Sequence, residues 1–279
     1  MIDSGTVYVV STPIGNLEDI SLRLKATLGK VNLIACEDTR HTKKLLSYLG
    51  IHTRLISYHN FNESSQAKKI INFLMEGNDV AIVSDAGCPV ISDPGYELIK
   101  LCHENKINII GIPGPSAITT AISISGIGAN GFIFEGFFPK KKIQRAAFIA
   151  NIKKSNKPII FFESVHRVRE TIDFLMLNIH FDHECFMGRE LTKKFEEYFM
   201  GSLEDLNIRL NKSPGSLKGE YIFIIQKTSI DSKEINNDYL ELLKFIDFEK
   251  LDSQSIKELS RITGISKNKI YREYIKKNC

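Results

Sequence analysis

Long hydrophobic runs are missing from this 279-residue sequence, and none approaches the roughly 20 residues that a transmembrane helix needs. The N-terminal segment MIDSGTVYVVSTP has no basic region ahead of its apolar stretch, so we expect no secretory signal peptide. Cysteine is scarce and widely spaced, with five residues and no CxxC pair. An odd number of separated cysteines indicates free thiols in a reducing compartment, which predicts a cytoplasmic location.

The sequence also lacks the motifs of several common enzyme classes. No GxGxxG follows the first strand-like segment, and neither GxxxxGK[ST] nor GxSxG occurs. Ordinary Rossmann nicotinamide enzymes, P-loop NTPases and α/β-hydrolases are therefore disfavoured. The seven histidines show no metal-ligand spacing, so we expect no metal site. The net charge of +4 is too small to identify a polyanionic partner, and the placement of the charges matters more than their sum.

Strand-like and helix-like segments alternate in the first half of the chain. Apolar residues at 67, 70, 71 and 74 follow helical spacing in one of the intervening segments. Strands separated by helices predict βαβ units and a largely parallel, buried sheet. The predicted strands are 6–11, 31–36, 54–59, 79–85 and 107–114.

The second half has several strand-like segments in direct succession, which predicts a mixed or antiparallel sheet. These segments are 132–138, 158–164, 184–191, 195–201 and 219–226, and helical stretches follow Lys142, Val165 and Ser202. A polar linker, 227–238, precedes a basic helical tail in which Gly264 separates two short helical patterns, as in a helix-turn-helix. We therefore predict an α/β protein with two α/β domains, 1–117 and 118–228, and a helical extension over 229–279.

Unusual turns follow three of the predicted parallel strands. Asp85-Ala86-Gly87 ends one strand, Pro13 lies in the turn after the first, and Ser116-Ala117 follows the fifth. Ligands bind beyond the carboxyl ends of the strands in open parallel sheets. Small residues allow a ligand to touch the backbone, and a helix that starts near Ser116 offers unpaired N–H groups. The three turns together predict a ligand site at this edge.

Nine ordered segments of the sequence resemble the ribosomal RNA small subunit methyltransferase I family. This family belongs to the tetrapyrrole-methylase class of S-adenosylmethionine enzymes. The segments are TPIGNLEDISLRL, CEDTRHTKKLL, SYHNFNE, SDAGCPVISDPGYEL, IPGPSA, FEGFFPKKK, FFESVHR, GRELTKKFEE and KGEYIFI. The sequence departs from the family pattern at Cys88, Val165 and Gly188, where Thr, Pro and Ala are usual.

The resemblance implies a two-domain tetrapyrrole-methylase-like fold, with S-adenosylmethionine bound between the domains. It implies 2′-O-methylation of a cytidine in the decoding region of small-subunit ribosomal RNA, and a homodimer. The donor-binding residues that it implies are Pro13, Asp85, Ala86, Gly87, Val90, Ser116, Ala117, Glu163 and Leu191.

Two basic clusters are candidates for RNA contacts. On a helix over 37–50, Arg40, Lys43 and Lys44 share one side and three leucines share the other. The second cluster is Lys140, Lys141, Lys142 and Arg145. Lysine and arginine contacts to phosphate supply affinity for RNA. Each cluster taken alone has a second interpretation, as ordinary solvated surface.

The expected chemistry is a direct in-line displacement at the sulfonium methyl that needs no metal. The sequence does not identify a general base. The candidates are Glu190, Lys193, His59 and Asp38, and each also has a structural interpretation.

Two alternatives remain open at this point. One is an enzyme of the same fold that methylates a corrin or siroheme precursor. The other is a non-enzymatic protein of ribosome assembly that binds RNA without a methyl donor.

Overall fold

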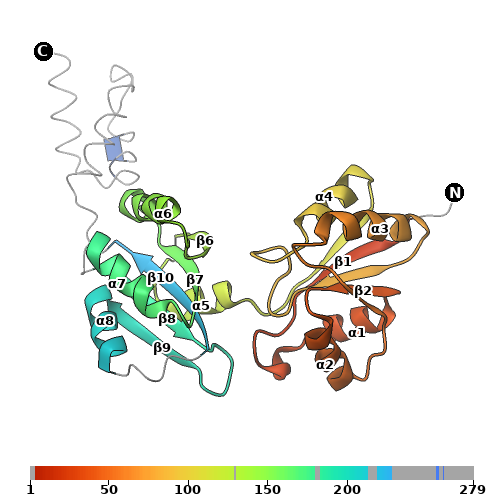
Figure 1. The fold of residues 1–279 in the computed structure, drawn as a ribbon, viewed down its shortest axis with the longest axis horizontal. Coiled ribbons are helices and arrows are strands. Elements are labelled where there is room, and N and C mark those ends of the chain that lie inside the picture. The colour runs from red at the N-terminus through yellow and green to blue at the C-terminus, as the bar shows by residue number, and fades with distance from the viewer. Residues whose placement is uncertain are drawn as a thin grey trace, which may run out of the picture. The chain divides into compact units, whose positions relative to one another are not determined.

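The computed structural model describes residues 4–128, 130–179, 183–212 and 219–227, together with positions 256, 257 and 260 (Figure 1). Met1–Lys227 forms one compact unit that contains two sheets, and Thr228–Cys279 forms a second unit. Almost all of the predicted linker and helical tail over 229–279 lies outside the described residues. The predicted division between residues 117 and 118 stays a prediction. No helix of the described residues is long and apolar enough to cross a membrane.

The first sheet is entirely parallel, as predicted, with the strand order β3-β2-β4-β1-β5. Its strands are β1 (Thr6–Val10), β2 (Leu33–Cys36), β3 (Leu55–Ser57), β4 (Val80–Val83) and β5 (Asn108–Ile112). Its helices are η1 (Leu17–Asp19), α1 (Leu22–Lys30), α2 (Thr39–Leu49), α3 (Glu63–Met75) and α4 (Tyr96–Glu104). Every residue of β2 and β4 is buried, because α1 and α2 cover one face of the sheet and α3 and α4 cover the other.

The second sheet is mixed, as predicted, with the order β6-β7-β10-β8-β9. Only β6 and β7 pair in parallel. Its strands are β6 (Ile133–Phe137), β7 (Ile159–Ser164), β8 (Glu184–Arg189), β9 (Glu197–Ser202) and β10 (Glu220–Gln226). Helices α6 (Lys142–Lys154), α7 (Val168–Asn178) and α8 (Leu203–Lys212) pack on one face, and α5 (Ala117–Ser125) packs on the other.

Helix α2 has the amphipathic pattern that the sequence predicts. Asp38 caps its start, since Oδ1 accepts a hydrogen bond from the Arg40 amide at 2.8 Å. Gly50 ends it in the left-handed conformation, with φ of 70°. Leu45 and Leu46 are buried. The predicted basic residues Arg40, Lys43 and Lys44 are exposed on the opposite side.

A candidate ligand site at the strand ends

The turn after β4 is held rigidly against the turn after β1. Thr12 and Gly87 form a β-bridge, with N···O distances of 2.9 and 3.1 Å. The buried Ser84 hydroxyl donates to the carbonyls of Ala86 and Gly87 at 3.2 Å each. Gly87 has a φ of +77°, which a residue with a side chain adopts only with strain. The sequence Asp85-Ala86-Gly87 therefore forms a fixed platform at the carboxyl end of the sheet.

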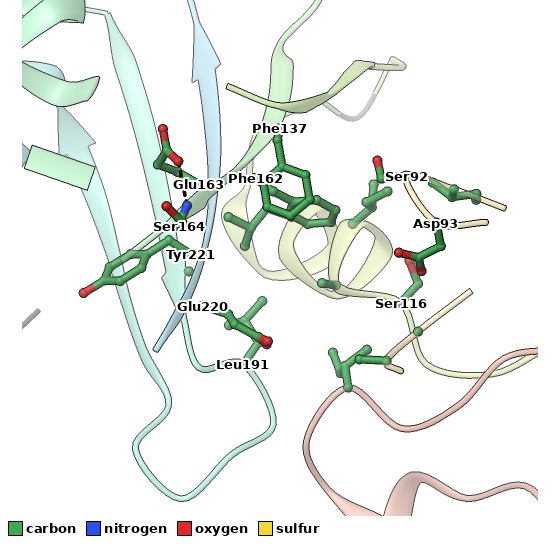
Figure 2. Close-up of a pocket in the computed structure, with 18 of the residues that line it drawn as sticks. Ser92, Asp93, Ser116, Phe137, Phe162, Glu163, Ser164, Leu191, Glu220 and Tyr221 are labelled. Atoms are coloured by element: carbon green, nitrogen blue, oxygen red, sulfur yellow. Dashed lines mark hydrogen bonds between the residues drawn. The ribbon is translucent and has the colours of Figure 1, made fainter. Parts of the chain in front are cut away.

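This platform is one wall of a cavity of about 460 Å³, shown in Figure 2. The start of α5, the loop between β4 and α4 and residues of the second sheet form other walls. Its volume lies within the range of about 300–1,000 Å³ that is typical of small-molecule sites. The cavity, called the first cavity below, is lined by seven of the predicted donor-binding residues: Asp85, Ala86, Gly87, Ser116, Ala117, Glu163 and Leu191.

Acidic groups gather near the platform, and the pKa values of Asp93 and Glu37 are raised. Burial, together with the charges of Glu37 and Asp85, raises the pKa of Asp93 to about 6. Burial and the charge of Asp85 also raise the pKa of Glu37. The Asp85 carboxylate accepts a hydrogen bond from the Asp38 amide at 3.1 Å. This part of the site favours a ligand that carries positive charge.

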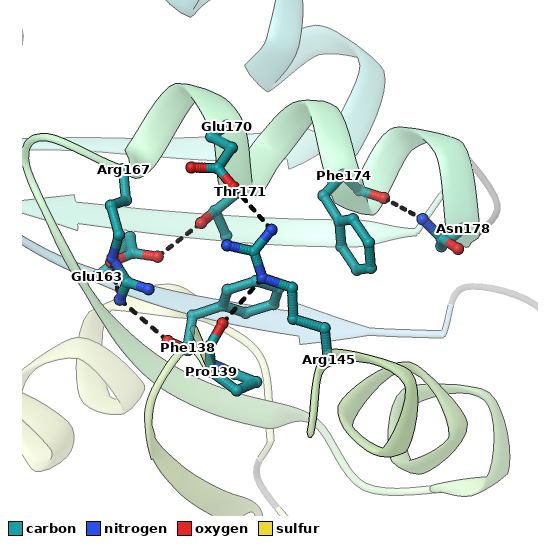
Figure 3. Close-up of polar contacts among 9 residues, drawn as sticks. All are labelled: Phe138, Pro139, Arg145, Glu163, Arg167, Glu170, Thr171, Phe174 and Asn178. Atoms are coloured by element: carbon teal, nitrogen blue, oxygen red, sulfur yellow. Dashed lines mark hydrogen bonds and ion pairs between the residues drawn. The ribbon is translucent and has the colours of Figure 1, made fainter. Parts of the chain in front are cut away.

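Glu163 lines the first cavity, but its carboxylate is committed elsewhere. Oε1 lies 2.6 Å from Nη2 of Arg167, and Oε2 accepts a hydrogen bond from Thr171 at 2.6 Å (Figure 3). The side chain is completely buried. Its carboxylate therefore anchors the turn after β7, and a donor-binding role for Glu163 stays a prediction.

Two other predicted donor-binding residues lie outside the first cavity. Val90 has a φ of 75° and packs over Gly95, where a Cβ would lie 2.7 Å from Val90 Cγ2. Its position supports the turn between β4 and α4, and it does not line the first cavity. Pro13 lines a neighbouring cavity instead.

The neighbouring cavity, called the second cavity below, has a volume of about 270 Å³. It shares four lining residues with the first cavity: Ile14, Asp85, Ala86 and Glu220. Helix α2 contributes His41, Lys44 and Leu45 to its wall, and Lys193 contributes from the turn after β8.

The turn after β8 borders both cavities. It carries two non-glycine residues in the left-handed region, Glu190 with φ of 50° and Thr192 with φ of 68°. Backbone conformations of this kind persist where the surrounding structure enforces them, and they occur often at functional sites. Leu191 lines the first cavity and Lys193 lines the second.

Lys193 lies between two carboxylates. Its Nζ is 3.0 Å from Oε1 of Glu190 and 2.9 Å from Oε2 of Glu220. Partial burial lowers the Lys193 pKa, but the bonds to Glu220 and Glu190 outweigh it, and the pKa is raised overall. Lys193 is therefore a cation at neutral pH, which disfavours it as the general base.

The other candidate bases are also weakened by their contacts. Partial burial raises the Glu190 pKa, but the Glu220 amide and Lys193 hold it below its usual value overall. Hydrogen bonds from Arg40 lower the pKa of Asp38, which caps α2. His59 lines neither cavity. A carboxylate with a lowered pKa is a poorer base.

The candidate RNA-binding cations differ in availability. Lys140, Lys141 and Lys142 are exposed, like the basic residues of α2. Arg145 has a different environment, with a side chain only 12% exposed. Its guanidinium pairs with Glu170 at 2.7 Å, donates to the Pro139 carbonyl at 3.0 Å and lies over the rings of two phenylalanines (Figure 3). These internal contacts disfavour RNA binding by Arg145, and its place in the RNA-binding set stays a prediction.

Several lining residues were not predicted from the sequence. Glu220 lies in both cavities, and Phe137 and Phe162 lie in the first. Glu220 begins a buried strand directly after a glycine, and a charged residue at such a position is a usable signal. The three departures from the family pattern, Cys88, Val165 and Gly188, all line the first cavity. Within the described ranges, no group of His, Cys, Asp or Glu could hold a metal ion.

Comparison with known proteins identifies the family. Residues 6–207 match the family model described as Tetrapyrrole (Corrin/Porphyrin) Methylases. The chain is 42% identical over 281 residues to ribosomal RNA small subunit methyltransferase I of Buchnera aphidicola subsp. Schizaphis graminum, which covers 98% of this chain and 96% of the relative. Identity to the protein of the same name from Halalkalibacterium halodurans is 38%, over 98% and 95% of the two chains.

Solved structures share the fold at low identity. The methyltransferase CobJ superposes with a TM-score of 0.61 at 15% identity, over 81% of this chain and 95% of that chain. Uroporphyrin-III C-methyl transferase from Thermus thermophilus, complexed with S-adenyl homocysteine, superposes with a TM-score of 0.54 at 14% identity, over 80% and 98%. The near-complete matches in sequence and the shared fold agree: this chain belongs to the ribosomal RNA small subunit methyltransferase I family of tetrapyrrole-methylase-type methyltransferases.

Proposed function

We propose that this protein transfers a methyl group from S-adenosylmethionine to the ribose 2′-hydroxyl of a cytidine in the decoding region of small-subunit ribosomal RNA. The observation that carries this proposal is the match, over nearly the full length, to relatives named ribosomal RNA small subunit methyltransferase I. We further propose that it acts in the cytoplasm as a homodimer.

The first cavity suits the methyl donor. Phe137, Phe162 and Ile222 supply an apolar wall of the kind that holds a purine ring. Ser116 precedes α5 and makes no side-chain capping hydrogen bond, so the first amides of α5 are available to an anionic group such as a carboxylate. The acidic groups near Asp85 favour the positive charge of a sulfonium.

The donor supplies an activated methyl group, and the chain's own residues supply orientation. The platform at Asp85–Gly87 is rigid, and Leu191 closes the opposite wall of the first cavity. Holding two reactants in line contributes much of the rate in a reaction between two bound molecules. Asp85 and Glu220 lie on the wall that both cavities share, but Glu220 is paired with Lys193 at 2.9 Å. Asp85 is therefore the carboxylate best placed to take the hydroxyl proton.

The test is methyl transfer from labelled S-adenosylmethionine to small ribosomal subunits that lack the modification, with modified subunits as the control. Label at one ribose, in a linkage that resists alkali, would support the donor, the acceptor and the position together. Donor binding without label would contradict the RNA assignment and favour a small-molecule acceptor. Absence of donor binding would contradict the proposal as a whole.

A further inference from the structure

We propose that the second cavity is the acceptor subsite, where Lys44 and His41 bind the phosphate of the nucleotide that is methylated. This inference rests on the proposed function and assigns the position of the RNA within the site.

The two cavities meet along a common wall. Ile14, Asp85, Ala86 and Glu220 line both of them. In a direct displacement, the attacking oxygen must come within about 3–3.5 Å of the carbon that it attacks. A donor held in the first cavity can meet this requirement only with an acceptor in a space that opens beside it. The second cavity is such a space.

Lys44 is an available cation at the second cavity. No carboxylate of the described residues forms an ion pair with it. By contrast, Arg40 on the same helix pairs with Asp38 at 2.7 Å, and Lys193 pairs with two glutamates. A lysine without an acidic partner is suited to a phosphate, and the adjacent His41 offers a further donor.

The size and the apolar part of the wall fit a nucleotide better than a macrocycle. The volume of about 270 Å³ is below the lower end, roughly 300 Å³, of cavities that enclose drug-sized ligands. One ribose and its phosphate fit within this volume, whereas a tetrapyrrole would extend beyond it. Pro13, Leu17 and Leu45 form an apolar side against which a sugar or base can pack.

Gly15 allows Lys193 to form the far side of this cavity. A Cβ on Gly15 would lie 2.3 Å from Lys193 Cγ, a separation that no side chain tolerates. The absence of a side chain at position 15 therefore lets the Lys193 chain cross the turn after β1. In this position the ammonium holds Glu220 at the shared wall, at 2.9 Å.

The experiment compares neighbouring lysines of α2 in the full-length protein. Lys44→Gln removes the cation from the second cavity, whereas Lys43→Gln removes an exposed cation that does not line it. Lys68→Gln, on α3 and away from both cavities, is the control for loss of one positive charge. Each variant is assayed for KM toward unmodified small subunits, kcat, donor Kd and melting temperature.

We expect Lys44→Gln to raise KM for subunits about tenfold or more, as loss of a charge-assisted contact does, with donor Kd within about twofold of the wild type. The slope of log affinity against log salt should fall by about 0.7, the value for one phosphate on a single strand. His41→Asn should raise KM in the same direction, Lys43→Gln should have a smaller effect, and Lys68→Gln should have none.

Three results would overturn the subsite. One is a KM for Lys44→Gln that is no higher than the KM for Lys43→Gln, when the wild-type enzyme does methylate subunits. The second is loss of donor binding in Lys44→Gln, which would place Lys44 in the donor site. The third is absence of methyl transfer by the wild-type protein, which would overturn the proposed function and the subsite together. The wild-type assay separates this result from the first two, in which the wild-type protein is active.

Discussion

The Arg167 guanidinium lies 2.6 Å from the fully buried carboxylate of Glu163 and holds the turn between β7 and α7 (Figure 3). The same Nη2 atom donates to the Phe138 carbonyl at 3.0 Å, which ties this turn to the end of β6. Ser164, the last residue of β7, and Val165, the first residue of the turn, both line the first cavity. The pair therefore fixes the position of the cavity wall, and its two charges neutralise each other.

Replacing Arg167 with Met should destabilise the protein strongly. The substitution leaves the Glu163 carboxylate buried without its cation, and breaking a buried pair in this way costs about 3–5 kcal/mol. Urea unfolding measures the free energy. Glu163→Gln keeps polar atoms near Thr171 and should lower the free energy of unfolding by less than Arg167→Met does. An equal or larger decrease for Glu163→Gln would contradict this account.

Arg145 should contribute to stability and little to RNA binding. Arg145→Met removes the ion pair to Glu170 and the contacts over Phe138 and Phe174, and we expect a loss of about 1–3 kcal/mol. Lys141→Gln is the comparison, because Lys141 is exposed in the same basic segment. Arg145→Met should lower the free energy of unfolding and leave subunit binding nearly unchanged. Lys141→Gln should weaken subunit binding and leave the free energy of unfolding nearly unchanged. Weakened binding with unchanged stability in Arg145→Met would support Arg145 as an RNA-binding residue.

The raised pKa of Asp93 predicts a pH dependence of stability. The folded carboxyl has a pKa of about 6, above its ordinary value of 3.8, so the folded state binds more protons than the unfolded state between these values. This group's contribution to stability is greatest below about pH 4 and is lost as the pH rises through 6. Asp93→Asn should therefore melt at a higher temperature than the wild type at pH 7–8, with the difference shrinking toward pH 4. A difference that is constant with pH would contradict the assignment.

Gly188 leaves room for the side chains that line the first cavity. A Cβ at this position would lie 3.0 Å from Ile222 Cγ2 and 3.1 Å from Leu191 Cδ1, so both must shift. Alanine is usual here in the family pattern, but in this chain it must displace Ile222 and Leu191. Gly188→Ala should therefore weaken donor binding severalfold and cost about 1–3 kcal/mol in stability, the usual range for overpacking. Calorimetric titration with S-adenosylhomocysteine measures the affinity.

Gly29→Ala is the matched control for Gly188→Ala. Gly29 lies in α1, and the added methyl would meet only Ile51 at 3.9 Å, an ordinary contact. It should raise stability by about 0.5–1 kcal/mol, because alanine favours helix over glycine, and should leave donor affinity unchanged. Equal donor affinities in the two variants would show that Gly188 does not shape the site.

The regular elements could be predicted from the sequence because local patterns determine them. The buried runs that became β2 and β4 are apolar at every position, and the spacing at Ala67, Ile70 and Ile71 matches the buried face of α3. Hydrophobic periodicity reports which face of an element meets the core, whatever its partner is. The turns at Asp85 and Ser116 were also recognisable, since they follow predicted parallel strands and ligands bind beyond the carboxyl ends of such strands.

The roles of single charged residues were less predictable, because they depend on partners distant in the chain. Nothing near Glu220 in the sequence shows that Lys193 lies 2.9 Å from its carboxylate. The residues around Arg145 form a basic cluster in the sequence, yet Glu170 forms an ion pair with that one arginine and neutralises its charge. A sequence pattern gives the type of a charge but not its environment, and the environment decides whether the group binds a ligand or its own fold.

The sequence alone determined the α/β class, the parallel and mixed sheets and the family, since these follow from local periodicity and from motifs in a fixed order. Only the tertiary structure decided that Glu163 is an internal anchor, that Lys193 is held as a cation, and that two cavities share the wall at Asp85 and Glu220. The physical reason is distance. Backbone periodicity acts over a few residues, whereas a site assembles from side chains that the chain brings together only when its sheets have packed.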